Sequence, residues 1–255
     1  MNEQARIFLY LVAYSARRQL RSKKTLLAAG FIGLVAIAVR VAGYWHPWDA
    51  KSFGDAIVHA VHMLFLLPMV ALMFGTGALG DDREEKTLVY LLTRPLHRRL
   101  IYAGKLFAVI PHVLLFSVGG LAALWAAARS HDVPELDGQL ELYLPGVALS
   151  ALAYVSFFHL LSAFFRNATL FSIVYVFLVE VVVGNLPGVI KRVSISFYTW
   201  SVLYEDAAGS GVKPGDFYFP VSAGLARWLL AGFAIAFLAI GAEVFRRKEY
   251  HDSGG

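Results

Sequence analysis

The sequence contains no cysteine and few charged residues. Asp, Glu, Lys and Arg together make up 16% of its 255 residues, whereas a soluble domain carries about 25%. The absence of cysteine excludes disulfides, thiolate metal ligands and cysteine nucleophiles. A P-loop is also absent, because Gly104-Lys105 has no glycine five residues earlier and no Ser or Thr after the lysine. The chain therefore lacks this ATP-binding motif.

Apolar residues are abundant and gathered into blocks. They make up 58% of the sequence, and the mean hydropathy is +0.60. Six blocks have about the 20 residues that a helix needs to cross a bilayer core of roughly 30 Å. Because a backbone in lipid must satisfy its own hydrogen bonds, each block predicts a helix. We therefore expect an all-α membrane protein with one domain over residues 1–255. The predicted spans are Thr25–Trp45, Ile57–Gly80, Ile101–Ala128, Leu142–Phe165, Ala168–Pro187 and Ala223–Phe245.

The basic residues are unequally divided between the two sides of this topology. Sixteen of the 23 Lys and Arg residues fall on one side, in the N-terminal segment, the loop after span two, the turn after span four and the tail. Loops that remain in the cytoplasm collect Lys and Arg, so both termini are predicted to face the cytoplasm of a bacterial inner membrane. This placement also explains the net charge of +5 as an orientation signal and a contact for anionic lipid headgroups, without a nucleic-acid partner.

Residues 1–24 have the pattern of an amphipathic helix. Arg6, Arg17 and Arg21 recur on one helical face, and Phe8, Leu11 and other apolar residues occupy the other. Such a helix typically lies in the plane of the membrane interface. The alternative is a solvated basic leader. A cleavable signal peptide is not indicated, because the apolar run is short and no small-residue cleavage site follows.

Residues 81–100, between spans two and three, combine charges with a leucine stripe. Acidic residues at 81–85 are expected to begin a short helix, where they offset the positive end of its dipole. Leu88, Leu91 and Leu92 follow at helical spacing. Pro95 is expected to end the helix. The sequence thus predicts a charged helix with an apolar patch on the cytoplasmic side.

This loop resembles the coupling region of type-two ABC exporter permeases. The matching parts, in order, are Glu84-Glu85, Thr87-Leu88, Leu91-Leu92, Pro95, Arg98-Arg99 and Gly104-Lys105. The family usually has glycine before the threonine, where this chain has Lys86, so we expect a more regular local helix. The resemblance extends over the chain and implies an N-terminal interfacial helix and six spans. It also implies a partner: a separate ATP-binding subunit in two copies, together with a second permease copy or a paralogue. In such a complex, residues 84–99 of the matching pattern would couple the permease to the ATPase.

Two charged residues lie within the predicted spans. Arg40 and Glu180 are about 22 and 18 Å from the cytoplasmic side at 1.5 Å per residue. Charged groups at such depth favour a functional role, here an ion pair in the outer half of the bundle. The equal alternative is that Arg40 reaches outward to the interface and Glu180 faces a water-filled vestibule.

The remaining polar and aromatic residues carry weaker signals. The histidines of the spans include His59 and His62, but no second pair or carboxylate cluster follows at ligand spacing, so packing roles are favoured over a metal site. The segment 188–222 is predicted to be extracytoplasmic, and its many aromatic residues are typical of an interfacial belt. In the exporter family, the equivalent stretch often forms short re-entrant helices near the exit.

Two other functions compete with transport. Glu84-Glu85 is similar to the paired glutamates of CAAX-type intramembrane proteases, but Val89 stands where that pattern needs arginine. A Gly-x-Ser-x-Gly nucleophile elbow is absent as well. The alternatives that stay open are an integral-membrane enzyme and a non-transporting membrane anchor in a larger assembly.

Overall fold

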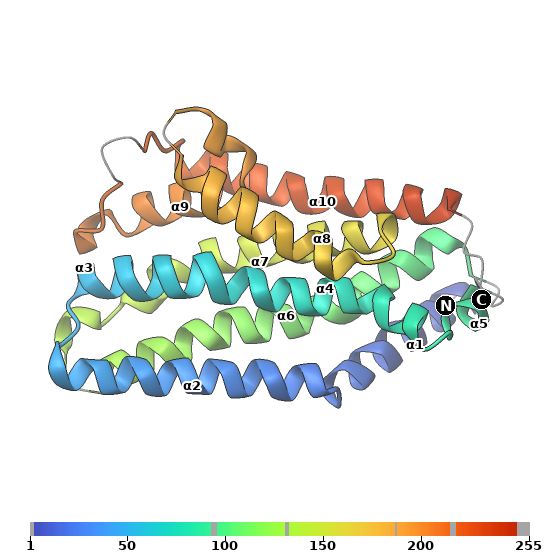
Figure 1. Cartoon of the computed structure of the whole chain (residues 1–255), viewed down its shortest axis with the longest axis horizontal. Coiled ribbons are helices and arrows are strands. Elements are labelled where there is room, and N and C mark those ends of the chain that lie inside the picture. The colour runs from blue at the N-terminus through green and yellow to red at the C-terminus, as the bar shows by residue number, and fades with distance from the viewer. Residues whose placement is uncertain (1–2, 93–95, 131–132, 187, 215–217, 249–255) are drawn as a thin grey trace.

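The long helices run side by side along one axis in the computed structural model of the chain (Figure 1). The structure describes residues 3–92, 96–130, 133–186, 188–214 and 218–248, apart from the side chains at 89 and 92, and no strand occurs in these ranges. Six helical segments are long and apolar enough to cross a membrane, which confirms the predicted all-α fold with six spans. These segments are Lys23–Trp45, Ala50–Glu84, Arg98–Arg129, Pro134–Phe164, Ala168–Asn185 and Ala223–Arg247.

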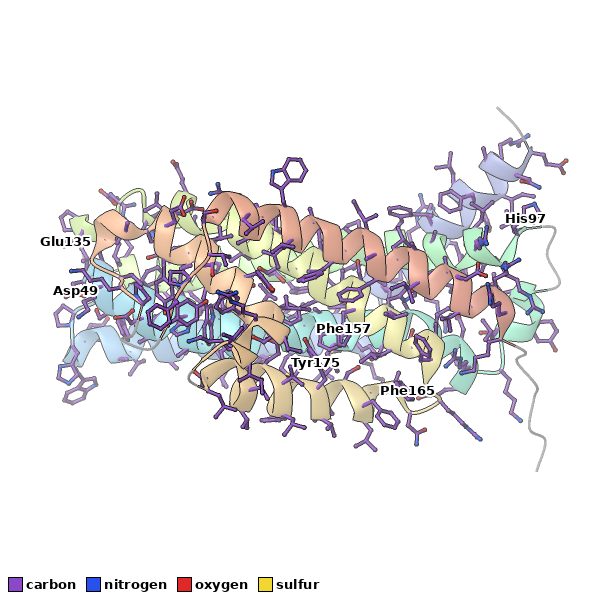
Figure 2. The ribbon with its side chains drawn as sticks, turned by 90° about the horizontal axis from the view of Figure 1, so that it is seen from above. Asp49, His97, Glu135, Phe157, Phe165 and Tyr175 are labelled. Carbon is purple, nitrogen blue, oxygen red and sulfur yellow. The ribbon has the colours of Figure 1, made fainter. Side chains whose placement is uncertain are left out.

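The two ends of the bundle differ in character. One end, called the basic end below, holds α1 (Glu3–Leu20), α5 (Leu88–Leu92), the start of α6 (Arg98–Arg129) and the end of α10 (Ala223–Arg247). At the opposite, far end, Figure 2 places Asp49 and Glu135, whereas His97 lies at the basic end. The other elements are α2 (Lys23–Trp45), α3 (Ala50–Ser52), η1 (Phe53–Leu66), α4 (Leu67–Glu84), η2 (Pro134–Leu136), α7 (Gln139–Phe164), α8 (Ala168–Tyr175), η3 (Val176–Val182), η4 (Val183–Asn185), η5 (Ile190–Val193), α9 (Ile195–Asp206) and η6 (Ala208–Ser210).

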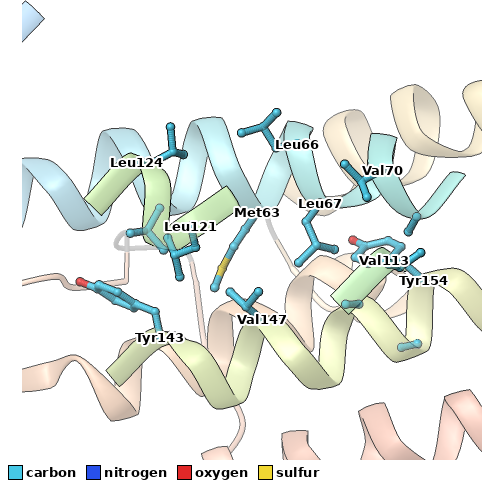
Figure 3. Packing of buried hydrophobic residues seen from close by; sticks show 14 of the residues in the cluster. Met63, Leu66, Leu67, Val70, Val113, Leu121, Leu124, Tyr143, Val147 and Tyr154 are labelled. Atoms are coloured by element: carbon cyan, nitrogen blue, oxygen red, sulfur yellow. The ribbon is translucent and has the colours of Figure 1, made fainter. Parts of the chain in front are cut away.

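Burial separates central from peripheral spans. In the most apolar window of the α7 span 67% of residues are buried inside the protein, and in that of the η1–α4 span 61%, compared with 22% for α2 and 17% for α10. Figure 3 shows the shared core, where Met63 and Leu67 of the η1–α4 span meet Val147 of α7. Gly75 allows this approach, because a Cβ there would lie 3.0 Å from the Phe158 Cβ atom. The peripheral helices leave apolar faces exposed, as membrane-spanning helices do.

The second span changes its hydrogen-bond pattern in the middle. η1 is a π-helix, and the Leu67 N–H donates to the carbonyl of His62, five residues earlier. Pro68 follows directly and has no N–H to donate to the preceding turn. π-Helical turns of this kind are accommodated in a span when neighbouring helices support them.

The N-terminal segment forms a helix of its own, α1, that bends away from α2. Ser22 caps α2, because its hydroxyl accepts a hydrogen bond from the Thr25 N–H at 3.4 Å. α1 packs against α6, where Gly104 allows Leu11 and Phe8 to approach closely. Part of the apolar face predicted for a lipid interface is therefore used for contact with α6. Leu9 and Leu20 remain more than half exposed.

Candidate functional site

The helix of span two extends beyond its predicted end at Gly80. α4 continues to Glu84, so the acidic residues lie in its last turn and not at the start of the next helix. Carboxylates are unfavourable there, because the helix dipole is negative at its C-terminal end. The structure offsets this cost with cations from other helices. Lys24 Nζ lies 2.6 Å from the Asp81 carboxylate, and Arg18 and Lys105 lie beside Asp82.

Asp82 is the centre of this network. Its side chain is 6% exposed and lies 2.9 Å from the Arg18 guanidinium and 2.5 Å from the Lys105 ammonium. Arg18 also contacts Glu85. Burial alone would lower the pKa of Arg18, but its hydrogen bond to Glu85 and the charge of Asp82 raise it above the ordinary value. The network joins α1, the end of α4 and α6 in one place.

The turn between α4 and α5 is strained at Lys86. This residue has φ +57°, in the left-handed region that favours glycine, and no other non-glycine residue in the described ranges has a positive φ. The expectation that Lys86 makes the local helix more regular is therefore wrong. The Thr87 N–H then donates to the Asp82 carbonyl at 2.9 Å, which fixes the turn.

The leucine stripe of α5 faces mainly inward. Leu88 is 3% exposed and belongs to an apolar cluster with Leu79 of α4 and Ile101 of α6. Leu91 is half-buried against the same cluster, and the side chain of Leu92 lies outside the described part. Leu88, predicted to dock on a partner, instead attaches α5 to the body of the protein. Tyr90, which the sequence pattern did not single out, is 75% exposed on this helix.

The predicted rim residues have different surroundings. Glu84, Glu85 and Thr87 are exposed. Arg99 is exposed and lies 2.6 Å from the Glu243 carboxylate of α10, and Arg98 donates to the Lys248 carbonyl at 3.1 Å. Pro95 lies outside the described residues. The two arginines therefore tie the start of α6 to the end of α10 and its following residue.

The C-terminal end of α7 is capped by two cations at the same end of the bundle. Arg83 donates to the Phe165 carbonyl at 3.0 Å, and Lys248 donates to the Phe164 carbonyl at 2.5 Å. Cations are favourable here, because the last carbonyls of a helix carry partial negative charge. Burial and the nearby charge of Arg83 lower the pKa of Lys248.

The second buried carboxylate, Glu180, lies on η3 and is 0% exposed. It accepts hydrogen bonds from the Tyr175 hydroxyl at 2.6 Å, from the Ile195 N–H at 3.0 Å and from the Ser196 N–H at 2.9 Å. Figure 2 shows Tyr175 beside Phe157 of α7. The last two donors are the first N–H groups of α9, so the carboxylate binds the positive end of that helix.

Arg40 is not among the contacts of Glu180. It is exposed on α2, a helix at the edge of the bundle. The predicted pairing relied on side-chain charges at similar depth, whereas Glu180 is satisfied by a hydroxyl and two backbone N–H groups. The start of α9 could have been recognised in the sequence from Ser194-Ile195-Ser196, because serine is a common N-cap and the Ser194 side chain caps this helix.

The aromatic residues of the segment 188–222 are mostly not arranged as a belt. Phe197 and Trp200 of α9 are 0% and 2% exposed and pack inside the protein, while Phe219 is 67% exposed. The prediction of an interfacial belt is therefore wrong for the residues of α9. The segment instead forms short helices, of which α9 packs against α7 and α10.

The histidines of the spans connect helices. His159 of α7 lies 3.3 Å from the Gly75 carbonyl of α4 and 3.2 Å from the Tyr102 carbonyl of α6. His62 lies 2.8 Å from the Ser117 carbonyl of α6. No group of three or more His, Asp or Glu residues suited to a metal ion occurs within the described residues.

Comparison with known proteins gives two results. Residues 3–249 match the family described as ABC-2 family transporter protein. The chain is also 29% identical to the probable ABC transporter permease protein NosY of Pseudomonas aeruginosa, in an alignment that covers 72% of this chain and 76% of the relative.

Proposed function

Because this chain belongs to the ABC-2 family of transporter proteins and is a membrane permease subunit of an ABC transporter, we propose that it forms the translocation pathway of an exporter. The ATP would be hydrolysed by a separate ATP-binding subunit, present in two copies. A second permease copy or a paralogue completes the pathway. The sequence supports this division of labour, because it has no P-loop.

In the proposed orientation the basic end faces the cytoplasm of a bacterial inner membrane. The excess of Lys and Arg at this end supports the assignment, because positively charged loops remain in the cytoplasm. The far end, with η5 and α9, would then face the outside. The two carboxylate sites would lie toward opposite faces of the membrane.

The observation that carries the coupling proposal is the orientation of α5. Its buried Leu88 holds the helix to the bundle, while Tyr90 is 75% exposed and lines one pocket with Glu85 and Arg18. Glu84 and Lys86, a few residues earlier in the chain, are also exposed. An aromatic residue surrounded by charges has the composition of a small interface, in which the apolar anchor supplies binding energy and the charges select the partner. Tyr90 would be the anchor for the ATP-binding subunit, with Glu84, Glu85, Thr87, Arg98 and Arg99 around it. Leu91 is half-buried against the same apolar cluster as Leu88. Leu91, Leu92 and Pro95 complete the proposed coupling segment.

The test is co-purification of the chain from its own cells, in mild detergent, followed by identification of any ATP-binding subunit that is retained. Tyr90→Ala should weaken retention of that subunit about tenfold, because truncating an aromatic anchor costs roughly 1–2 kcal/mol. Tyr44→Ala is the matched control, since Tyr44 is 69% exposed at the far end of α2. Both variants should insert and unfold like the parent.

Two results would contradict different parts of the proposal. If Tyr90→Ala retains the subunit as well as Tyr44→Ala does, the docking surface is wrong. If no ATP-binding subunit co-purifies even with the parent chain, the coupling itself is wrong and the membrane-anchor alternative replaces it.

A further inference from the structure

A polar cavity lies at the basic end, between the second half of α1, the end of α4 and α6. Its volume is about 630 Å³. α4 contributes the small residues Gly77 and Ala78, which leave room opposite α1. Arg17, in the last turn of α1, and Arg21, which follows directly after α1, also line the cavity.

The charges around the cavity do not balance. Its three acidic residues each have a cation: Asp81 contacts Lys24, and both Asp82 and Glu85 contact Arg18. Lys105 is the second cation on Asp82. Arg17 and Arg21, in contrast, have no ion pair with any described residue. Five cations, Lys24 included, against three carboxylates leave a net charge of +2, which predicts an anionic ligand.

A second observation in the same wall points to a ligand with acceptor oxygens. Ser15 lines the cavity and is 6% exposed, and its hydroxyl has no hydrogen-bond partner. Buried hydroxyl groups are normally hydrogen-bonded, so an orphaned one marks a place where a partner is missing. The Ser15 oxygen is itself fully buried beside the cavity, so its side chain must rotate to donate to a ligand there. A phosphate group accepts hydrogen bonds from both hydroxyl and guanidinium donors.

The apolar surface beside the cavity identifies the source of that phosphate. Leu26 and Leu27 of α2 are 73% and 66% exposed. They lie four and five residues beyond Ser22 of the cavity wall, about 6–8 Å along the helix axis. Tyr14 and Leu20 of α1 are also more than half exposed. The membrane-spanning helix α2 thus offers an exposed apolar surface that begins about 6–8 Å from the cavity wall.

We propose that this cavity binds the phosphate headgroup of an anionic phospholipid, with Arg17 and Arg21 holding the charge and the acyl chains lying along the exposed face of α2. The lipid would stabilise the bend between α1 and α2 against the end of α4. The site does not depend on which subunit docks at α5.

The test measures lipid retained by the purified full chain, by native mass spectrometry after exposure to equal amounts of phosphatidylglycerol and phosphatidylcholine. The double variant Arg17→Gln/Arg21→Gln should retain at least about tenfold less phosphatidylglycerol, because it loses two charge-assisted contacts. The control is Arg6→Gln/Lys23→Gln, which removes the same charge from exposed positions outside this cavity wall. The control should lose less than about threefold, as expected for surface charges. Ser15→Ala should give a loss of about threefold.

Three outcomes would overturn the proposal. Equal losses in the two double variants would show that the lipid responds only to general surface charge. Unchanged retention in both Ser15→Ala and the Arg17/Arg21 variant would place the lipid elsewhere. Displacement of the lipid by millimolar inorganic phosphate would assign the cavity to a soluble anion.

Discussion

Asp82 and Glu180 are both buried carboxylates, but the protein satisfies them in opposite ways. Asp82, at the basic end, is held by two cations from α1 and α6. Glu180 is held by three neutral donors, two of which are the first N–H groups of α9. An ion-pair network can be rearranged by the charges of an approaching partner, whereas the contact of Glu180 is made within the chain and anchors α9 to span five.

The difference agrees with the proposed roles of the two ends. The network around Asp82 adjoins the turn that presents α5, so under the proposed coupling a force on α5 would reach α1 and α6 through charged side chains. Glu180 and Ile195 are connected by a segment that returns to the bundle, and the carboxylate closes this loop. The basic end thus joins its helices through ion pairs, and the far end joins η3 to α9 through neutral donors.

The largest expected effect comes from removing the charge of Asp82. Asp82→Asn leaves the Lys105 ammonium, whose side chain is 8% exposed, without a carboxylate. Breaking a buried ion pair on one side costs about 3–5 kcal/mol. Thermal unfolding in detergent should show this loss. Asp137→Asn is the control, because its ion pair with Arg129 is about half exposed and should cost less than about 1 kcal/mol. Equal effects would mean that Asp82 contributes no more than a surface charge.

A smaller loss is expected from Glu180→Gln. The amide keeps the size of the side chain, but its NH2 group must face one of the three donors and leaves it unsatisfied, at a cost of about 1–3 kcal/mol. No buried cation is stranded, so the effect should be smaller than that of Asp82→Asn. The absence of native cysteine allows a second measurement, in which Val202→Cys, buried in α9, should react faster with a thiol reagent in the Glu180→Gln background. Unchanged reactivity would show that Glu180 does not hold α9.

The two carboxylates also show which features a sequence reveals. The six spans could be predicted, because a bilayer imposes length and apolar composition on each helix separately. A short helix between spans two and three could be predicted from the spacing of its leucines. The partner of Glu180 could not, because its donors are backbone N–H groups that carry no residue signature. The burial of Leu88 within the protein could not be predicted either. Leucine spacing indicates an apolar helix face, but it does not indicate whether the same chain or a partner covers that face.

The smallest expected effect concerns the turn that connects the Asp82 network to α5. Lys86 has φ +57°, and a left-handed conformation costs a non-glycine residue roughly 1–2 kcal/mol. Glycine relieves this strain but loses about 0.5–1 kcal/mol through its more flexible unfolded state. Lys86→Gly should therefore stabilise the chain by about 0.5–1 kcal/mol, visible as a higher unfolding temperature. Lys86→Val should have the opposite sign, because a β-branched side chain is disfavoured at positive φ.

A control for this prediction is Glu84→Gly, which places glycine in the last turn of α4, two residues earlier. Here no strain is relieved, so the substitution should destabilise by about 0.5–1 kcal/mol. Destabilisation by Lys86→Gly as well would mean that the turn is not strained at this residue. Stabilisation by Lys86→Gly together with destabilisation by Glu84→Gly would show that the chain has lysine at position 86 although the backbone there favours glycine. The backbone conformation at Lys86 disfavours lysine there. The presence of an exposed lysine near Tyr90 in the sequence would then be explained by its charge at the proposed docking surface.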